Sequence, residues 1–298
     1  MDKTDMALCL LLLSNSRLSY RELADKLNLS ATAVHSRIRS LVEQGVIRRF
    51  SAKISIGALG AATVIIFGPS KVASAQVLYE ELIKHGSVYW LGIGGGSFIY
   101  IGAYLRSIVD LEPLVGYVEK ATGILEPNVG IMSYPSPTGA YPSANARLSN
   151  LDYQIIRSLK DDSRKAVSDI AQELGVSSKT VRRRLNRMVE LGLVDLSIDW
   201  YPDASNDIIT VLHLNLKPEV DRSVVDRVLQ KYWPNIFFYW GFSNIPNLLL
   251  AFMWTNTMKE VKTICENLER ETVFRSVLPN VLYTGYIFKT WVDRLVDG

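Results

Sequence analysis

Apolar residues recur at helical spacing in two stretches of the chain, residues 20–47 and 167–194. In both stretches the spacing predicts two amphipathic helices that are separated by a short turn and bury one side in a small core. A further short helix is expected before each stretch and a β-type run after it. The expected helices are residues 4–13 and 151–159, and the expected strands are residues 46–52 and 193–200.

The two stretches align without a gap at an offset of 147 residues, since Ser30 falls on Ser177, and this offset is close to half of the 298-residue chain. Identical residues occupy both core and polar positions of the alignment. They include Ala24 and Ala171, Leu27 and Leu174, Val34 and Val181, Arg37 and Arg184, Glu43 and Glu190, and Gly45 and Gly192. The chain is therefore predicted to contain an internal duplication.

Each copy has the local signals of a helix-turn-helix. The turn between the second and third helices carries Asn28 or Gly175, residue types that tolerate the left-handed backbone at a helix end. Ser30 and Ser177 stand where the third helix begins, and a hydroxyl there can accept from the free amides of the first turn. The run after the third helix is predicted to form a wing, which makes the unit a winged helix-turn-helix.

The segments between and after these units alternate strands and helices in the order βαββαβ, which is the ferredoxin-like order. In the first copy the expected elements are residues 61–67, 72–85, 88–91, 98–105, 108–122 and 124–132. In the second copy they are residues 208–216, 223–232, 236–240, 248–254, 258–272 and 277–288. The predicted fold class is α+β, with two winged helix-turn-helix domains alternating with two ferredoxin-like domains.

Domain boundaries follow from this order and from a Pro-, Gly- and Ser-rich stretch in the middle of the chain that reads as an exposed linker. The expected domains are a first winged helix-turn-helix at 1–52, a first α+β domain at 53–134, a linker at 135–147, a second winged helix-turn-helix at 148–201 and a second α+β domain at 202–298.

Composition narrows the class of protein. The chain has 33 basic and 30 acidic residues, a net charge of +3, and two cysteines, which give neither a disulfide framework nor a metal site. Residues 88–105 and 232–258 are uncharged, but glycines, prolines and asparagines interrupt both runs, as expected for pairs of buried strands joined by hairpins. A membrane protein is therefore not expected, and the cysteine usage fits a reducing cytoplasm.

Basic residues concentrate on the outward side of the expected third helix and in the first wing. A run of charges on a helix is usually only a solvated face, but here it falls on the third helix of a repeated three-helix pattern, which favours contact with DNA phosphates and base edges. The candidate DNA-binding residues of the first copy are Ser30, Ala31, Thr32, His35, Ser36, Arg37, Arg39, Arg48 and Arg49. Those of the second copy are Ser178, Lys179, Arg182, Arg183, Arg184, Asn186 and Arg187. Because Asp195 and Asp199 lie in the second run, the second wing is not expected to contact phosphate as the first would.

These two blocks resemble the DNA-binding domain of the Lrp/AsnC (leucine-responsive, feast/famine) regulators, most closely in Ser30–Val34, Arg37, Leu41–Glu43 and Gly45–Phe50, and a second time around Ser177–Val181. The resemblance implies double-stranded DNA as partner and a small-molecule-sensing α+β domain that pairs through its sheet. Because two units are fused here, that pairing is expected inside one chain, with further chain–chain association into a homodimer or larger oligomer through the aromatic-rich second copy.

In this family an effector lies near the turn between the central strands, so Gly94, Gly95, Gly96, Ser97, Ser243 and Asn244 are the candidate ligand-binding residues. Neither turn contains the acidic residue usual for amino-acid sensors, and the glycines also fit a plain tight hairpin. No cofactor is predicted.

Two other functions remain open. Siroheme decarboxylases resemble this layout and also carry an Arg-Arg-Phe motif like Arg48-Arg49-Phe50, but their chemistry needs His, Tyr and Arg in the α+β domains, and no histidine lies in the central hairpins. An architectural DNA-binding protein without an effector shares the basic helices. The sequence favours a transcriptional regulator that is not an enzyme.

Overall fold

The computed structural model describes residues 1–72, 74–134 and 147–297. The chain divides into two compact units, each assembled from segments that are far apart in the sequence. The helix-turn-helix unit takes its described residues from the ranges Met1–Gly60, Ser136–Ser205 and Trp291–Gly298, and the sheet unit from Ala61–Pro135 and Asn206–Thr290. The expected linker, apart from Arg147, lies outside the described residues. The expected end of the last domain at residue 298 differs from this division, because residues from Trp291 on join the helix-turn-helix unit.

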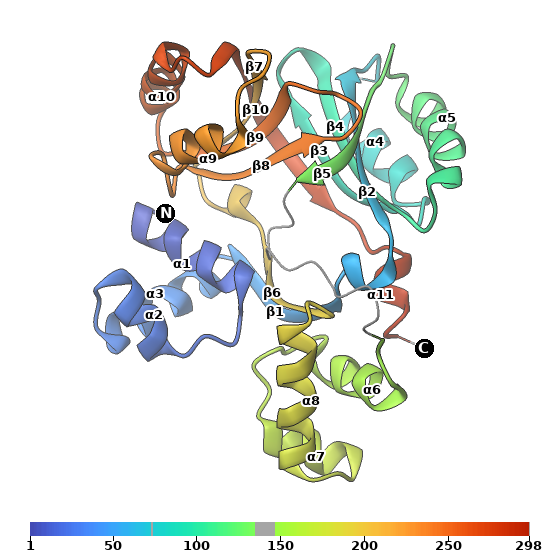
Figure 1. The fold of residues 1–298 in the computed structure, drawn as a ribbon, viewed down its shortest axis with the longest axis vertical. Coiled ribbons are helices and arrows are strands. Elements are labelled where there is room, and N and C mark those ends of the chain that lie inside the picture. Colours follow the sequence, from blue (N-terminus) through green and yellow to red (C-terminus); the bar gives the residue numbers. More distant parts are fainter. Residues whose placement is uncertain (73, 135–146, 298) are drawn as a thin grey trace. The chain divides into compact units, whose positions relative to one another are not determined.

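The helix-turn-helix unit contains two heads with the same order of elements (Figure 1). The first head consists of α1 (Lys3–Ser14), α2 (Tyr20–Leu27), α3 (Ala31–Glu43) and β1 (Ile47–Ile54). The second head consists of α6 (Asn150–Leu159), α7 (Val167–Leu174), α8 (Ser178–Glu190) and β6 (Val194–Trp200). Short helical turns at Gly57–Leu59 and Pro202–Ala204 follow the two strands, and α11 (Trp291–Arg294) completes the unit. The three-helix pattern read from the sequence is confirmed in both copies.

Each head has its own core, formed by the apolar positions that the repeat predicts. In the first head Leu8, Leu23, Val34 and Leu41 are buried together. In the second head Ile156, Ile170, Val181 and Met188 play the same part. The turn residues Asn28 and Gly175 both have the left-handed backbone, with φ of 53° and 64°, so the helix ends follow the predicted signals.

The two strands that were expected as wings pair with each other. β1 and β6 form an antiparallel two-stranded ribbon in which Phe50 lies opposite Ile198 and Ser51 opposite Ser197. The ladder buries apolar side chains of both strands against the two cores. Backbone groups that a wing would offer to solvent or to phosphate are therefore used to join the heads.

The junction between the heads is reciprocal. The hydroxyls of Ser16 and Ser163, which occupy equivalent positions 147 residues apart, lie 2.6 Å from each other. The guanidinium of Arg17 donates to the carbonyl oxygen of Ser163 at 2.6 Å, and that of Arg164 donates to the carbonyl oxygen of Ser16 at 2.6 Å. Equivalent residues that contact one another mark a pseudo-two-fold axis, as in an isologous dimer interface.

The sheet unit is built from two βαββαβ copies (Figure 1). The first copy contains β2 (Ala62–Pro69), α4 (Ala75–Leu82), β3 (Val88–Gly94), β4 (Phe98–Leu105), α5 (Leu111–Thr122) and β5 (Asn128–Tyr134), with short helical turns at Gly95–Ser97 and Ile108–Asp110. The second copy contains β7 (Ile208–Leu216), α9 (Arg222–Gln230), β8 (Ile236–Phe242), β9 (Leu248–Thr255), α10 (Met258–Arg270) and β10 (Phe274–Ile287). The predicted ferredoxin-like order is present twice.

The two four-stranded sheets join edge to edge into one closed sheet with the order β10-β3-β4-β2-β5-β8-β9-β7. The last strand of each copy makes the junction: β5 pairs with β2 and then with β8, while β10 pairs with β7 and then with β3. Both junctions are antiparallel, and they remove the free edges that each sheet would have alone.

Three apolar layers hold this unit together. The outer face of the first sheet packs on α4 and α5, and the outer face of the second packs on α9 and α10. The inner faces meet in a third cluster that contains Phe67, Tyr100 and Phe252. The expected internal pairing of the two copies is thereby confirmed, within one chain.

Part of the aromatic-rich segment of the second copy lies at the internal interface. Phe242 is buried in the inner cluster, and Phe237, Phe238 and Trp240 pack against it. Association of two chains through the remaining aromatic residues stays a prediction. Among the helices of the described residues, none combines the length and the apolar character that crossing a membrane requires.

Candidate nucleic-acid interface

The third helix of each head presents one side to its core and the opposite side to solvent. In α8, Val181, Leu185 and Met188 are buried, which fixes the rotation of the helix and leaves the intervening positions exposed. The hydroxyl of Ser177 caps the helix by accepting from the amide of Thr180 at 3.2 Å. In α3, Ser30 does the same for Ala33 at 3.1 Å, so this predicted DNA-binding side chain is engaged in capping.

Lys179, Arg182 and Arg183 are exposed on α8 and form no ion pair among the described residues, and Asn186 is exposed beside them. The adjacent Ser178 is also exposed at the helix start. Cations with no internal partner at the beginning of a third helix can neutralise phosphates, and neighbouring polar side chains can reach base edges in a major groove.

Arg37 and Arg184 are directed toward the first helix of their own head. Arg184 donates to Asp152 at 3.2 Å and to the hydroxyl of Ser149 at 2.8 Å, at the start of α6. Arg37 makes the equivalent bonds to Asp5 and Asp2, both at 2.7 Å. These guanidiniums fasten the third helix to the first, and their contact with DNA stays a prediction.

The Asp152 side chain is 1% exposed, so its charge depends on these partners. Burial alone would raise its pKa, but hydrogen bonds from Ser149 and the guanidinium of Arg184 hold the pKa below its usual value. The carboxylate therefore stays ionised inside the head. Arg187, another candidate, also lies near it, with 3.8 Å between Nη1 and the carboxylate, and is only partly available to DNA.

Arg49 in the first head is engaged by two carboxylates. Its guanidinium donates to Asp199 at 2.6 Å and to Asp161 at 2.5 Å, and the hydroxyl of Ser51 also donates to Asp199. Asp199 was expected to keep the second wing away from phosphate; it serves instead as the partner of Arg49 across the β1–β6 ribbon. Arg48 remains exposed, with its guanidinium carbon 3.6 Å from the centre of the Tyr201 ring.

The outward side of α3 carries few free cations. Ala31, Thr32, His35 and Ser36 are exposed. His35 packs edge-on against the Tyr20 ring with 5.1 Å between ring centres. The remaining exposed cation, Arg39, pairs with Glu43 at 2.8 Å; an exposed pair of this kind is weak and opens readily.

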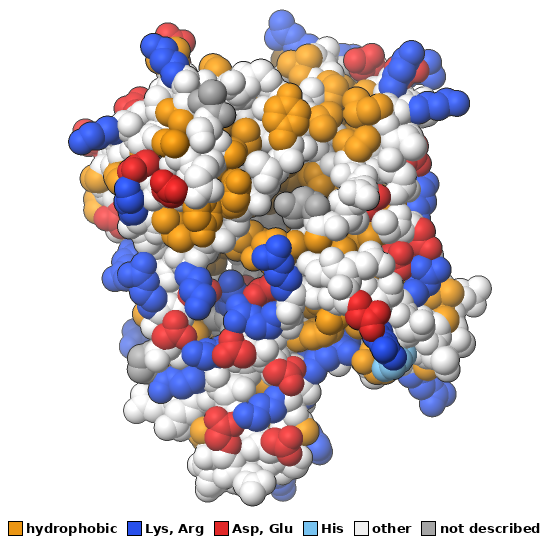
Figure 2. Space-filling model, turned by 180° about the vertical axis from the view of Figure 1, so that it is seen from behind, with side chains coloured by type: hydrophobic (Ala, Val, Ile, Leu, Met, Phe, Trp, Pro, Cys, Tyr) orange, Lys and Arg blue, Asp and Glu red, His pale blue; other side chains and the backbone are white. Residues whose placement is uncertain are grey.

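Figure 2 shows how the charged side chains are distributed on one face of the molecule. Over the helix-turn-helix unit Lys and Arg side chains are interspersed with Asp and Glu, whereas apolar side chains are frequent on the sheet unit. The mixture of charges on this face agrees with the modest net charge of +3.

The predicted ligand turns are largely filled by the protein itself. In the first copy the amide of Gly95 donates to Asn280 at 2.7 Å, and a Cβ on Gly94 would collide with the same side chain. Gly96 and Ser97 have positive φ of 67° and 58° and form the hairpin turn. The glycines thus serve a tight turn and a close strand approach, rather than an open cradle for an anion.

The second turn joins the two sheets. The side-chain amide of Asn244 accepts from the amide of Ile131 at 2.8 Å and donates to the carbonyl of Val129 at 2.7 Å. The neighbouring Ser243 donates through its amide to Ile131 at 2.9 Å. Both residues form hydrogen bonds to β5, and the binding of a ligand by them stays a prediction.

A pair of polar side chains that the sequence did not bring together lies between the inner faces of the sheets. The hydroxyl of Tyr100 and Nε2 of His213 are 2.6 Å apart, and the rings of Phe67 and Phe98 lie against the imidazole. Burial lowers the pKa of His213 to about 4, so the ring is neutral at pH near 7. No sequence signal could pair these residues, which are 113 positions apart and belong to different copies.

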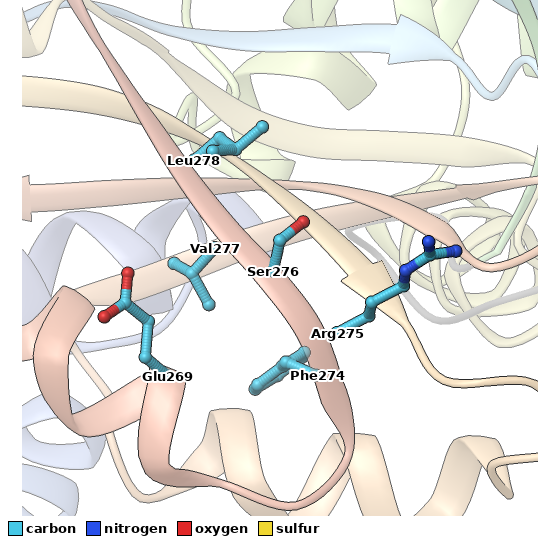
Figure 3. Close-up of a pocket in the computed structure, with 6 residues that line it drawn as sticks. All are labelled: Glu269, Phe274, Arg275, Ser276, Val277 and Leu278. Carbon is cyan, nitrogen blue, oxygen red and sulfur yellow. The ribbon is translucent and has the colours of Figure 1, made fainter.

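A surface hollow of ≈ 330 Å³ lies at the start of β10 (Figure 3). Its lining includes Glu269 from α10 and Arg275 and Ser276 from β10. Figure 3 shows Glu269 and Arg275 on opposite sides of the strand, pointing apart. The hydroxyl of Ser276 already accepts from Asn215 at 2.9 Å, so these groups do not converge on a common point.

Comparison with known proteins supports the assignment of both heads as helix-turn-helix domains. A family model described as winged helix-turn-helix DNA-binding matches residues 1–48 and again residues 148–195. An uncharacterized HTH-type transcriptional regulator of Pyrococcus furiosus is 31% identical over 133 residues, which are 44% of this chain and 89% of the relative. Another from Pyrococcus horikoshii is 36% identical over 118 residues, which are 39% of this chain and 80% of the relative.

Among solved structures, the siroheme decarboxylase NirDL matches along the whole chain. Its TM-score is 0.62 with 14% identity, and the match covers 99% of this chain and 96% of that one. Likeness at this identity shows that the four-domain fold is shared. The regulators, in contrast, are matched over most of their length by less than half of this chain. The chain belongs to the HTH-type transcriptional regulators of the Lrp/AsnC type and carries two units of that family in one polypeptide.

Proposed function

We propose that this protein is a sequence-specific, DNA-binding transcriptional regulator in which one chain supplies both reading heads. The observation that carries the proposal is the set of exposed cations Lys179, Arg182 and Arg183 on the third helix of a winged helix-turn-helix, which form no ion pair within the described part of the chain. Exposed Thr32, His35, Ser36 and Asn186 complete the reading surfaces.

The joining of the heads supports a single-chain reader. The β1–β6 ribbon and the reciprocal bonds of Arg17 and Arg164 place α3 and α8 in one compact unit. Regulators with one head per chain need two chains to present two recognition helices, because paired half-sites are read by paired helices. Here the duplication provides both, and association of two chains would give four heads.

The proposal extends to a protein without enzymatic activity that acts in the cytoplasm, where its DNA lies. A small-molecule effector is part of the family pattern, but the turns that would hold it are filled by Asn280 and Asn244. An effector that binds at those turns would therefore have to displace these side chains.

Binding to DNA tests the proposal directly. The full chain should bind a labelled duplex with an affinity that falls steeply as salt rises, because Lys and Arg displace counterions from phosphates. Repeated selection from a randomised duplex pool should enrich a defined sequence by at least about a thousandfold over bulk DNA. No binding at low salt would refute the proposal, and binding without any enrichment would favour an architectural protein.

A tetrapyrrole enzyme is the second candidate, because the fold matches NirDL, whose structure is also known with an iron-uroporphyrin III analogue. The Tyr100–His213 pair would supply polar groups in the sheet unit. Against it, aromatic rings already pack around His213. Titration with iron uroporphyrin would decide: a Soret shift that saturates at one ligand per chain supports this candidate, and an unchanged free-porphyrin spectrum excludes it.

A further inference from the structure

The outward sides of the two recognition helices differ in charge at equivalent positions. Three cations of α8 that form no ion pair among the described residues have counterparts in α3, at the 147-residue offset, that are neither Lys nor Arg. The pairs are Lys179 and Thr32, Arg182 and His35, and Arg183 and Ser36. All six side chains are exposed, so packing does not dictate the difference.

The frames that carry these side chains are otherwise alike. Both third helices begin at a serine cap, both bury apolar residues at the same positions, and both are fastened to the first helix by an inward arginine, Arg37 or Arg184. The one exposed arginine of α3 without a cationic counterpart in α8, Arg39, is paired with Glu43. The asymmetry is therefore confined to the surface that would meet DNA.

The position of Lys179 is unfavourable for the helix itself. It lies in the first turn of α8, where the helix dipole is positive, and no acidic residue lies in that turn to balance it. A positive side chain in that place weakens the free protein rather than stabilises it. The arrangement of the three cations is that of a surface shaped for an anionic partner, and a helix N-terminus with added cations suits phosphate.

We propose that the two heads have unequal tasks on DNA, with α8 anchoring the chain to phosphates and α3 discriminating base pairs with little electrostatic anchoring. This inference rests on the proposed DNA-binding function and adds a defined orientation of the protein on its DNA site. A pseudo-two-fold protein with one strong and one weak head sits on its site in a single orientation. The two halves of that site are different sequences of unequal importance.

Exchange of the three positions between the heads tests the division of tasks. The second-head variant carries Lys179→Thr, Arg182→His and Arg183→Ser, and the first-head variant carries Thr32→Lys, His35→Arg and Ser36→Arg. A control variant, Lys259→Thr with Lys262→His and Arg270→Ser, alters three exposed cations of α10 in the same way. Thermal unfolding of each variant verifies that the fold is intact.

The readout is the salt dependence of binding to a short mixed-sequence duplex. The slope of log affinity against log salt should become smaller by about 3 in the second-head variant and larger by about 3 in the first-head variant. The control should keep the slope of the natural chain. If the second-head variant and the control change equally, the inference is wrong while DNA binding stands; if the natural chain does not bind, the proposed function itself fails.

Orientation is tested with a DNA-cleaving reagent tethered to one head at a time. Both native cysteines are buried, at 0% and 8% exposure, so a single exposed cysteine can be labelled selectively. Asp25→Cys on α2 and Gln172→Cys on α7 are exposed, equivalent positions. On a sequence selected from a randomised pool, each label should cut one end, and opposite ends for the two labels. Equal cutting of both ends by either label would overturn the single orientation.

Discussion

Arginine residues in this protein separate into two groups by what stands next to them. Arg37, Arg49 and Arg184 each face carboxylates at 3.2 Å or less, whereas Arg182 and Arg183 face solvent. In the sequence all five lie in the basic segments formed by the third helices and the strand that follows the first of them. The first three arginines hold helices and strands together, whereas Arg182 and Arg183 form no ion pair among the described residues.

Removal of Asp152 tests the group that faces carboxylates. Asp152→Ala deletes a buried carboxylate that caps α6 and pairs with Arg184, and should lower the free energy of unfolding by about 2 kcal/mol. Asp5→Ala in the first head is the matched control, and it should cost less because Arg37 keeps Asp2 at 2.7 Å. Urea denaturation measures both; equal losses would show that the buried carboxylate has no special weight.

The buried histidine gives stability a pH dependence. Burial lowers the pKa of His213 from 6.5 to about 4, so the unfolded chain takes up this proton before the folded chain does. The free energy of unfolding should therefore fall as pH drops from about 6.5 to about 4. This group contributes at most about 3 kcal/mol to the fall.

His213→Phe isolates this effect. His213 in β7 and Phe67 in β2 occupy equivalent places. His213 pairs with Leu250, the third residue of β9, and Phe67 pairs with Tyr100, the third residue of β4. The variant should unfold with less dependence on pH across that window, measured by urea titration at several pH values. His35→Gln on the exposed side of α3 is the control and should leave the slope unchanged. A slope that His213→Phe does not alter would contradict the role given to the buried ring.

At the level of elements, the β1–β6 ribbon converts two domains into one reader. Its ladder is flanked by Arg17 and Arg164, each of which donates to two backbone carbonyls of the opposite head. Such bonds add to the apolar side chains that the ribbon buries against the two cores. The ribbon and these two arginines therefore fix the spacing between α3 and α8.

Arg17→Ala together with Arg164→Ala should loosen this junction. Hydrogen bonds from charged groups contribute about 1.5–3 kcal/mol each when buried, and both guanidiniums are half-buried, so a combined loss of about 3 kcal/mol is expected. Affinity for a selected two-half-site duplex should fall, while affinity for a single half-site should not. Scanning calorimetry and titration of the two duplexes provide the measurements, and an equal fall on both duplexes would refute a role in spacing.

At the level of the whole molecule, the duplication lets one chain cover apolar sheet faces and pair strand edges that would otherwise need a second chain. The inner faces of the two sheets cover each other around Phe67, Tyr100 and Phe252, and β5 and β10 close both edges. The sheet faces are thus not available for pairing with a second chain. Further association into a homodimer stays a prediction, and of the aromatics expected to mediate it Trp233 is half exposed.

Separation of the two copies tests this internal pairing. Residues 1–134 and 147–298 expressed apart would each expose an apolar sheet face and two strand edges, which soluble monomers rarely tolerate. We expect each half to aggregate or self-associate alone and to form a one-to-one complex when co-expressed, as measured by light scattering. Two soluble halves that ignore each other would contradict the closed sheet. Light scattering of the intact chain measures its own association in the same experiment.

The sequence by itself determined the repeat, the three-helix heads and the βαββαβ order, because these depend on local periodicity, caps and turns such as Ser30, Asn28 and Gly175. It also placed the exposed cations of α8, since their positions follow from the buried stripe of the same helix. Only the tertiary structure decided which cations are free, because Arg49 and Asp199 are 150 residues apart and meet through a strand pairing that no local signal records. The same reason applies to the wings that became a ribbon and to Asn280 in the glycine turn. Contacts between residues of different copies depend on how the two copies pair and pack in three dimensions. The periodicity within one copy carries no information about that packing.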